Sequence, residues 1–163
     1  MPEGICNTSP IQYLHQLGCL QILPALARGK IVVPPAVVVE LSQGRERGIS
    51  LPVLEDSDWV VVRKPLSMAV LPLVTDLGQG ETEVLALALE HPMALAVLDD
   101  SRARRLANML HIHVRGTLGL LLDAKTAGLI STVAPMLDRL ESLRFHLSSN
   151  TRDIVLRIAG EKA

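Results

Sequence analysis

The chain has 163 residues, of which 48% are hydrophobic and 20% are charged; this balance predicts a globular protein with a buried core and excludes a disordered chain. The 16 basic and 17 acidic residues give a net charge of −1, so overall charge provides no attraction to nucleic acid or to a membrane surface. The sequence contains one Tyr, one Trp and one Phe, which excludes an RNA-binding module that stacks bases on several aromatic rings.

The first part of the chain alternates short β-branched runs with helical patterns. A strand is expected at residues 4–6, two helical segments across residues 10–26, and a second strand at residues 30–33. The paired prolines that follow are typical of a strand end and the first turn of a helix, which Gly44 is expected to end.

The middle of the chain continues the same alternation. It predicts a third strand at residues 59–62, a helix that opens across residues 78–83, a fourth strand at 94–98, a helix at 101–110 and a short strand at Val114. The strands are apolar without alternation, which indicates burial on both faces. The fold class is therefore α/β, with a central parallel sheet between two layers of helices.

After Thr117 the pattern predicts helices alone, at residues 118–127, at 133–143, and from about 149 to Gly160. The second of these carries an apolar stripe formed by Val133, Met136, Leu137, Leu140 and Leu143. The stripe either covers the sheet or contacts a partner chain. Because no repeat or linker is present, we predict a single domain over residues 1–163, with residues 118–163 as C-terminal helices packed on it.

Cys6 and Cys19 are the two cysteines, and their apolar surroundings predict buried thiols rather than a disulfide framework. The N-terminus shows no basic-then-apolar leader, and the richest apolar stretch, residues 85–98, falls short of the ~20 residues that a bilayer requires. We therefore expect a reduced, cytoplasmic protein without a membrane span.

Polar residues at the ends of strands are the first candidates for a site, because ligands of parallel α/β sheets bind outside the carboxyl ends of the strands. The candidates near such ends are Asn7-Thr8-Ser9, Glu40, Glu81 with Glu83, and Asp99-Asp100. Each has an ordinary structural alternative, since such side chains also cap helices or lie solvated on helix surfaces.

The spacing of the acids adds weight to the functional alternative. Glu81 shares a helix face with Val84 and Ala88, at the rim of the expected apolar stripe, whereas Glu83 points about 200° away. Glu40 lies partly toward the core side of its helix. Carboxylates at a core rim are costly unless they are paired, protonated or bound to a cation, and clustered oxygens suit Mg²⁺ or Mn²⁺.

Taken in order along the chain, these segments resemble the PIN-domain family, in its branch of small prokaryotic proteins related to the toxin ribonucleases of toxin–antitoxin pairs. The matching segments are Asn7-Thr8-Ser9-Pro10, Val33-Pro34-Pro35-Ala36-Val37 with Glu40-Leu41, Gly80-Glu81-Thr82-Glu83 with Ala86-Leu87-Ala88, Leu98-Asp99-Asp100-Ser101-Arg102-Ala103-Arg104, and Gly116-Thr117-Leu118-Gly119. The resemblance implies a three-layer α/β/α sandwich with the first and fourth strands adjacent. It also implies a divalent-metal-dependent ribonuclease site, an RNA substrate and a homodimer.

Carried over position by position, the family's acids correspond to Asn7, Glu40, Glu81 and Asp99, with Glu83 and Asp100 as competing assignments. Thr8 corresponds to the hydroxyl neighbour of the first acid. Glu40, Glu81 and Asp99 would hold the Mg²⁺ or Mn²⁺ ion.

Asn7 departs from the family, which places Asp at this position. An asparagine keeps an oxygen ligand but loses a negative charge and gains an NH₂ donor that cannot face a cation. We therefore expect weakened metal binding at the first position.

Two groups of basic residues complete the candidates. Arg102 and Arg105, with Arg104 and Arg115 nearby, either bind RNA phosphates or lie solvated and paired with acids. His111 and His113 would share a face of an extended strand, as a metal pair or, more simply, as a structural pair.

Two functions from different classes follow. The first is a PIN-like, metal-dependent endoribonuclease, a toxin-type component with an antitoxin partner, whose activity Asn7 weakens. The alternative is a catalytically silent PIN-like module that binds RNA or a protein partner.

Overall fold

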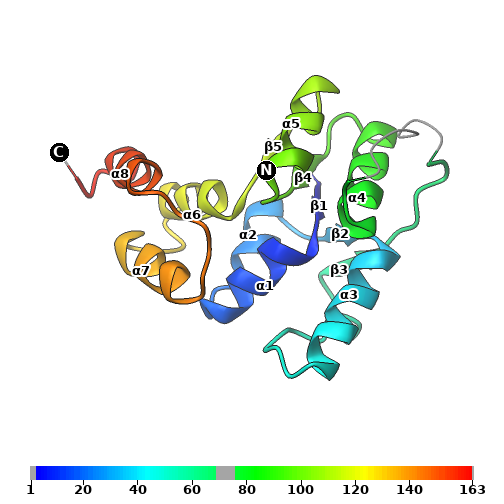
Figure 1. Cartoon of the computed structure of the whole chain (residues 1–163), viewed down its shortest axis with the longest axis horizontal. Helices are drawn as coiled ribbons and strands as arrows, with labels where there is room; N and C mark the ends of the chain where they lie inside the picture. Colours follow the sequence, from blue (N-terminus) through cyan, green and yellow to red (C-terminus); the bar gives the residue numbers. More distant parts are fainter. Residues whose placement is uncertain (1–2, 69–75, 163) are drawn as a thin grey trace.

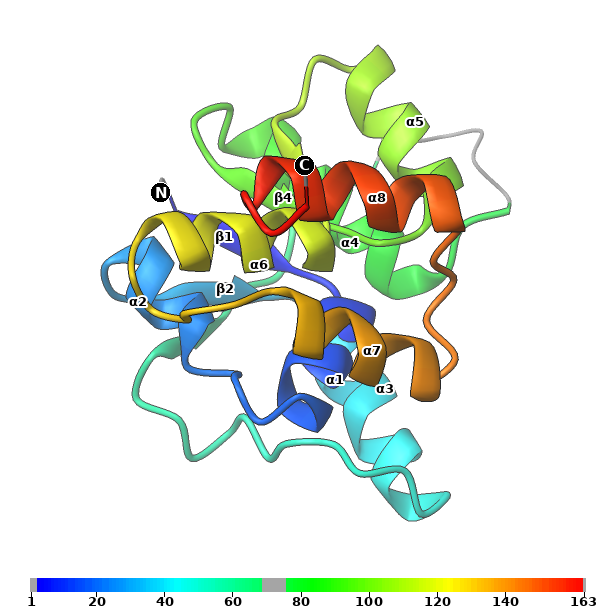
Figure 2. The ribbon, with the colours of Figure 1, turned by 90° about the vertical axis from the view of Figure 1, so that its left-hand side faces the viewer.

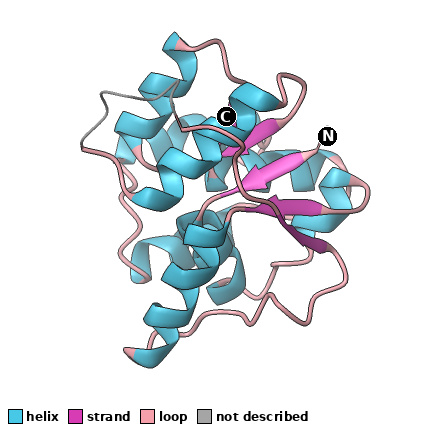
Figure 3. Ribbon diagram, turned by 90° about the vertical axis from the view of Figure 1, so that its right-hand side faces the viewer, coloured by secondary structure: helices cyan, strands magenta, loops and turns pink. Residues whose placement is uncertain are grey.

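The computed structural model describes residues 3–68 and 76–162, and its centre is a sheet of five parallel strands (Figure 1). The strands lie side by side in the order β3-β2-β1-β4-β5 (Figure 3). Their bounds are β1 Gly4–Cys6, β2 Ile31–Val33, β3 Val60–Val62, β4 Leu95–Val97 and β5 Val114–Arg115. The expected parallel sheet and the pairing of the first and fourth strands are both confirmed.

Eight helices occur in the described residues: α1 Thr8–Gln16, α2 Ile22–Ala27, α3 Pro35–Glu46, α4 Gln79–Glu90, α5 Ser101–Met109, α6 Thr117–Thr126, α7 Ala134–Ser142 and α8 Ser149–Ile158. Local signals explain several of their ends. Pro35 occupies the first helical position of α3, Ser148 caps α8 by accepting a hydrogen bond from the backbone of Thr151, and Gly160 follows α8 with φ 70°.

Successive residues of each central strand point to opposite faces of the sheet and enter two separate cores. Cys6 and Val97 pack with residues of α1, α2, α3, α6 and α7, whereas Ile5 and Ala96 pack with residues of α4 and α5. The sheet is therefore covered by helices on both faces, which confirms the expected three-layer sandwich.

Two expectations from the apolar pattern need correction. Strand β3 is not buried on both faces, because it lies at the edge of the sheet and Val62 is 53% exposed. Helix α4 has no single apolar stripe, because the run from Glu83 to Ala88 is buried on all sides. A helix enclosed in this way gives no periodic signal of which side faces solvent.

The C-terminal helices α6, α7 and α8 gather on one side of the molecule (Figure 2). Val133, Leu137 and Leu140 of the apolar stripe are fully buried in the same core as Cys6. Of the two alternatives for this stripe, the structure supports the first, because these residues cover the chain's own core.

Glu161 ties these helices together from a position just beyond α8. Its carboxylate accepts hydrogen bonds from the backbone N–H groups of Val133 (2.6 Å) and Ala134 (2.8 Å), at the start of α7, and pairs with Lys125 of α6 at 2.6 Å. The Lys125 ammonium and these N–H groups lower the pKa of the Glu161 carboxyl to about 2.

Glu161→Gln is therefore expected to lower the Tm at pH 7. Because the folded-state pKa is depressed, the stabilisation is present above the carboxyl's ordinary pKa of about 4.3 and disappears as the pH falls toward 2. Thermal unfolding at pH 7, 5, 4 and 3 checks this, with Glu46→Gln at the exposed end of α3 as the control. A Tm difference that does not shrink in acid would contradict the expectation.

No helix in the described residues is long and apolar enough to cross a membrane.

Candidate functional site

The order of the strands places a topological switch point between β1 and β4, since the chain proceeds from β1 to β2 and β3 on one side and to β5 on the other. A crevice forms at the carboxyl ends of strands where the order reverses in this way. Asn7 directly follows β1, and its backbone N–H donates to the carbonyl of Val97 at the end of β4 (3.1 Å). Asp99 lies two residues beyond Val97, so both strand ends bring a polar side chain to this crevice.

Asn7 is 2% exposed and sits at the N-cap position of α1, yet its side chain makes no capping hydrogen bond. Its Nδ2 donates instead to Oε1 of Glu81 at the start of α4 (3.2 Å). Its Oδ1 is buried and has no hydrogen-bond partner in the structure. A buried amide oxygen without a donor is costly and indicates a place where a ligand or a specific strain is accommodated.

Glu40 faces that unpartnered oxygen from α3. One of its carboxylate oxygens accepts the hydroxyl of Thr8, and the other accepts the backbone N–H of Gly80 at 3.0 Å. A methyl group on Gly80 would lie 2.7 Å from Oδ1 of Asn7 and 2.8 and 2.9 Å from the two oxygens of Glu40. The absence of a side chain at Gly80 therefore lets α4 approach this group of oxygens closely.

Asp99 is held by α6 rather than by the other acids. Its Oδ1 accepts the backbone N–H of Thr117 and its Oδ2 accepts the Thr117 hydroxyl, both at 2.7 Å. Burial raises the pKa of the Asp99 carboxyl, while these hydrogen bonds and the nearby Arg104 act in the opposite direction. After burial itself, the negative charge of Asp99 also raises the pKa of the buried Cys6 thiol, as expected of an unreactive cysteine.

The two competing acids have structural partners. Asp100 caps α5 by accepting the backbone N–H groups of Arg102 and Ala103, each at 2.9 Å. Glu83 is buried, contrary to the expectation from a one-sided stripe, and accepts the backbone N–H of Ala36 at 2.9 Å in the first turn of α3. Both carboxylates therefore satisfy helix N-termini.

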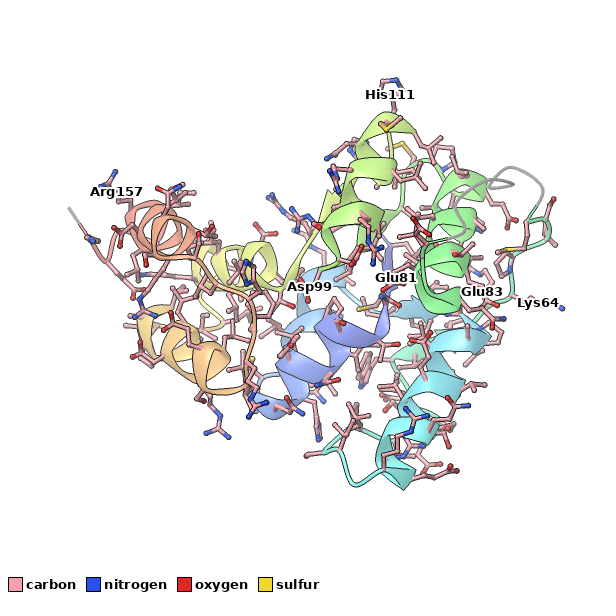
Figure 4. All side chains as sticks on the ribbon, viewed as in Figure 1. Lys64, Glu81, Glu83, Asp99, His111 and Arg157 are labelled. Atoms are coloured by element: carbon pink, nitrogen blue, oxygen red, sulfur yellow. The ribbon has the colours of Figure 1, made fainter. Side chains whose placement is uncertain are left out.

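Glu81, Asp99 and Asp100 line one cavity of about 360 Å³, called here the acid cavity, and Ser9 and Tyr13 line it from α1. Figure 4 shows Glu81 and Asp99 above α1, with Glu83 farther away toward Lys64. The Asn7 amide thus contacts Glu81, and the backbone of Gly80, the residue before Glu81, contacts Glu40. Asp99 lines the same cavity as Glu81.

The arginines that line a cavity are not the same set as the two expected to bind phosphate, Arg102 and Arg105. Arg104, Arg105 and Arg115 line a second cavity of about 530 Å³, called here the arginine cavity, which also includes Asp99. Arg102, although expected to bind phosphate, does not line either of these cavities in the described part of the chain.

His111 and His113 do not form a pair on one strand. His111 has φ 58° in the turn after α5, and β5 begins only at Val114. Figure 4 shows His111 at the far end of α5 from Asp99.

The chemistry of the donors suits a hard divalent cation at the Asn7–Glu40 end of the site. The unpartnered Oδ1 of Asn7 and the carboxylate of Glu40 are oxygen ligands directed into one small space. Across residues 3–68 and 76–162, however, no three His, Cys, Asp or Glu side chains are grouped closely enough to hold a metal ion. The expected set of Glu40, Glu81 and Asp99 is therefore assembled around the crevice without forming a single ligand cluster.

Some residues of this site escaped the sequence-based prediction. Gly80 and Thr117 lie in segments that carry the resemblance, but only the contacts of Gly80 with Glu40 and of Thr117 with Asp99 reveal what they do. His146 lines both cavities from the connection between α7 and α8, more than 40 positions along the chain from Asp99. No spacing rule links residues so far apart.

One comparison with known proteins agrees with this architecture. No curated protein and no solved structure matches the chain. Residues 3–161 match a family model described as a PIN domain. This match covers nearly the whole chain, including both strand ends of the crevice, and PIN domains have a nuclease-type fold and generally use divalent metal ions. The protein therefore belongs to the PIN-domain family.

Proposed function

We propose that this protein is a divalent-metal-dependent endoribonuclease, a toxin-type component of a toxin–antitoxin pair that acts in the cytoplasm, and that Asn7 lowers its metal affinity. Residues 1–163 act as one PIN-like domain, and a homodimer is the expected assembly. The observation that carries the proposal is the buried, unpartnered Oδ1 of Asn7 beside the Glu40 carboxylate, at the carboxyl ends of β1 and β4. Family membership supports it.

The residues have separate tasks in this proposal. Oδ1 of Asn7 and the Glu40 carboxylate would contact Mg²⁺ or Mn²⁺ at one end of the crevice, and Glu81 and Asp99, which do not join them in one ligand cluster in this structure, would complete the metal site. Thr8 and Gly80 orient the Glu40 carboxylate by donating to its two oxygens. Thr117 fixes Asp99 in the same way. A bound cation would act as a Lewis acid that activates a water molecule and neutralises negative charge on the phosphodiester.

Cleavage of a panel of RNAs in the presence of Mn²⁺ tests the function. We expect slow cleavage by the native chain, cleavage at least tenfold faster by Asn7→Asp, and none by Asp99→Asn, since an added carboxylate strengthens cation binding. Asn150→Asp, at the exposed start of α8, is the matched control for the change in charge. The proposal fails if Asn7→Asp and the native chain are equally inactive on every RNA.

One observation favours a second candidate, a silent module that binds RNA or a protein partner. Nδ2 of Asn7 donates a hydrogen bond to the Glu81 carboxylate, so the amide stabilises the negative charge of Glu81 in place of a cation. An acid site satisfied in this way holds together without a cation. Calorimetry with Mn²⁺ separates the two candidates, because tight binding by the native chain is incompatible with the silent module.

A further inference from the structure

The acid cavity and the arginine cavity adjoin, and together they are called here the groove. Four residues line both of them: Asp99, Ser101, Phe145 and His146. The groove therefore runs from Glu81, past Asp99, to the arginines of α5. A chain that places one phosphodiester bond at Asp99 extends its neighbouring phosphates along this groove.

The two ends of the groove differ in charge. The arginine cavity carries Arg104, Arg105 and Arg115, and it adds neutral hydrogen-bond donors from Asn108 and Thr151. Asp99, at the junction with the acid cavity, is the one carboxylate among the residues that line it. Such a set of donors suits a phosphate and repels a cation.

The three arginines are not equally available. Arg115 forms a two-point pair with Asp123 through contacts of 3.1 and 3.3 Å. Arg104 lies beside Asp99 and is directed at the carbonyl of Leu98, 3.5 Å away. Arg105 is exposed and makes no hydrogen bond or ion pair with any residue of the described ranges. Its guanidinium is thus free to bind a ligand.

His146 also lines this end of the groove. The segment that carries it is positioned by Arg144, which has φ 64°, and by Phe145, whose ring packs edge-to-face on Tyr13 of α1 with centroids 4.9 Å apart. The connection between α7 and α8 therefore contributes an exposed imidazole to a site whose arginines come from α5 and β5.

We propose that the arginine cavity binds a backbone phosphate of the RNA strand next to the cleaved bond, with Arg105 as the main contact and His146 as a second donor. This inference rests on the proposed function for the identity of the ligand. It predicts that RNA is held partly by the C-terminal segment and that Arg102, one turn earlier in α5, does not take part.

The test is the binding of a short labelled single-stranded RNA, measured by fluorescence anisotropy in EDTA between 50 and 200 mM salt. Arg105→Gln is expected to weaken binding about tenfold and to reduce the slope of log K against log salt by about 0.7, the value for one lost contact to a single strand. His146→Ala is expected to weaken binding about threefold, and His146→Arg to restore it.

Two matched controls keep the result specific. Arg102→Gln removes the same charge from the same helix, and Arg157→Gln removes it from α8, where Figure 4 shows Arg157 at the far end of the molecule from Asp99. Both should bind RNA as the native chain does. Equal affinity and equal salt slope for Arg105→Gln and these controls would overturn the inference, as would a native chain that binds no RNA.

The outcomes also separate this inference from the proposed function. RNA binding in EDTA requires no cleavage. If the protein binds RNA through Arg105 but never cleaves RNA in Mn²⁺, the result supports the phosphate site and contradicts the proposed nuclease activity. If RNA is cleaved in Mn²⁺ and Arg105→Gln changes neither cleavage nor binding, the result supports the nuclease activity and contradicts the phosphate site.

Discussion

Asn7→Asp is expected to lower the Tm by roughly 5–10 °C in EDTA and to make the Tm rise when Mn²⁺ is added. The substitution replaces the Nδ2 donor to Glu81 with a carboxylate oxygen, and it places a second negative charge beside Glu40 in a position that is 2% exposed. Loss of a hydrogen bond to a charged group and the new repulsion together cost about 2–4 kcal/mol.

A bound cation reverses this cost, because it binds the folded state alone and stabilises it by about 2.7 kcal/mol at a concentration one hundred times its Kd. Thermal unfolding of the native chain, Asn7→Asp and the exposed control Asn150→Asp, each in EDTA and in Mn²⁺, measures both effects. If Asn7→Asp is as stable as the native chain in EDTA, the amide is not satisfying Glu81 as the structure indicates.

Gly80→Ala is expected to destabilise the protein by roughly 1–3 kcal/mol and to abolish any response of the Tm to Mn²⁺. An added methyl group would lie less than 3.0 Å from Oδ1 of Asn7 and from both oxygens of Glu40. Those oxygens cannot simply turn aside, since Glu40 is held by Thr8 and by the backbone of Gly80 itself. Either the start of α4 or the Glu40 side chain must move.

Helix propensity acts in the opposite sense, because alanine is favoured over glycine inside a helix by about 1 kcal/mol. Gly119→Ala in the first turn of α6 is the matched control, since its methyl group would meet the side chain of Arg115, which is 51% exposed and can shift toward solvent. Urea unfolding should show Gly119→Ala equal to or more stable than the native chain. A Gly80→Ala variant that gains stability to the same degree would show that the oxygens around Gly80 are not held in place.

Much of the fold could be predicted because its signals are local. The short apolar runs at β1, β2 and β4, the prolines at the start of α3 and the capping serine of α8 each act within a few residues. The strand β3 and the helix α4 were both predicted, but the burial expected for β3 on both faces and the single apolar side expected for α4 were wrong. Burial there depends on which elements pack against the strand or helix, and a uniformly apolar run does not reveal that.

The candidate site divides in the same way. The resemblance pointed to Asn7, Glu40, Glu81 and Asp99 as the site residues, and the structure places them around one crevice. The structure also shows that Asp100 and Glu83, which the sequence left as competing assignments, bind the N-terminal backbone of α5 and of α3. Of the two predicted phosphate contacts, Arg105 lines the groove and Arg102 does not.

Sequence alone determined the order of strands and helices, the family and the substitution at position 7, because these are properties of residue identity and short-range spacing. Only the tertiary structure decided what Asn7 does. Its amide bridges to Glu81 across 74 positions, its oxygen faces Glu40 without a donor, and Gly80 leaves the room for both. Such contacts arise from the packing of α3 and α4 at the end of β1, and the free energy of a buried polar group depends on the partners that this packing brings within reach.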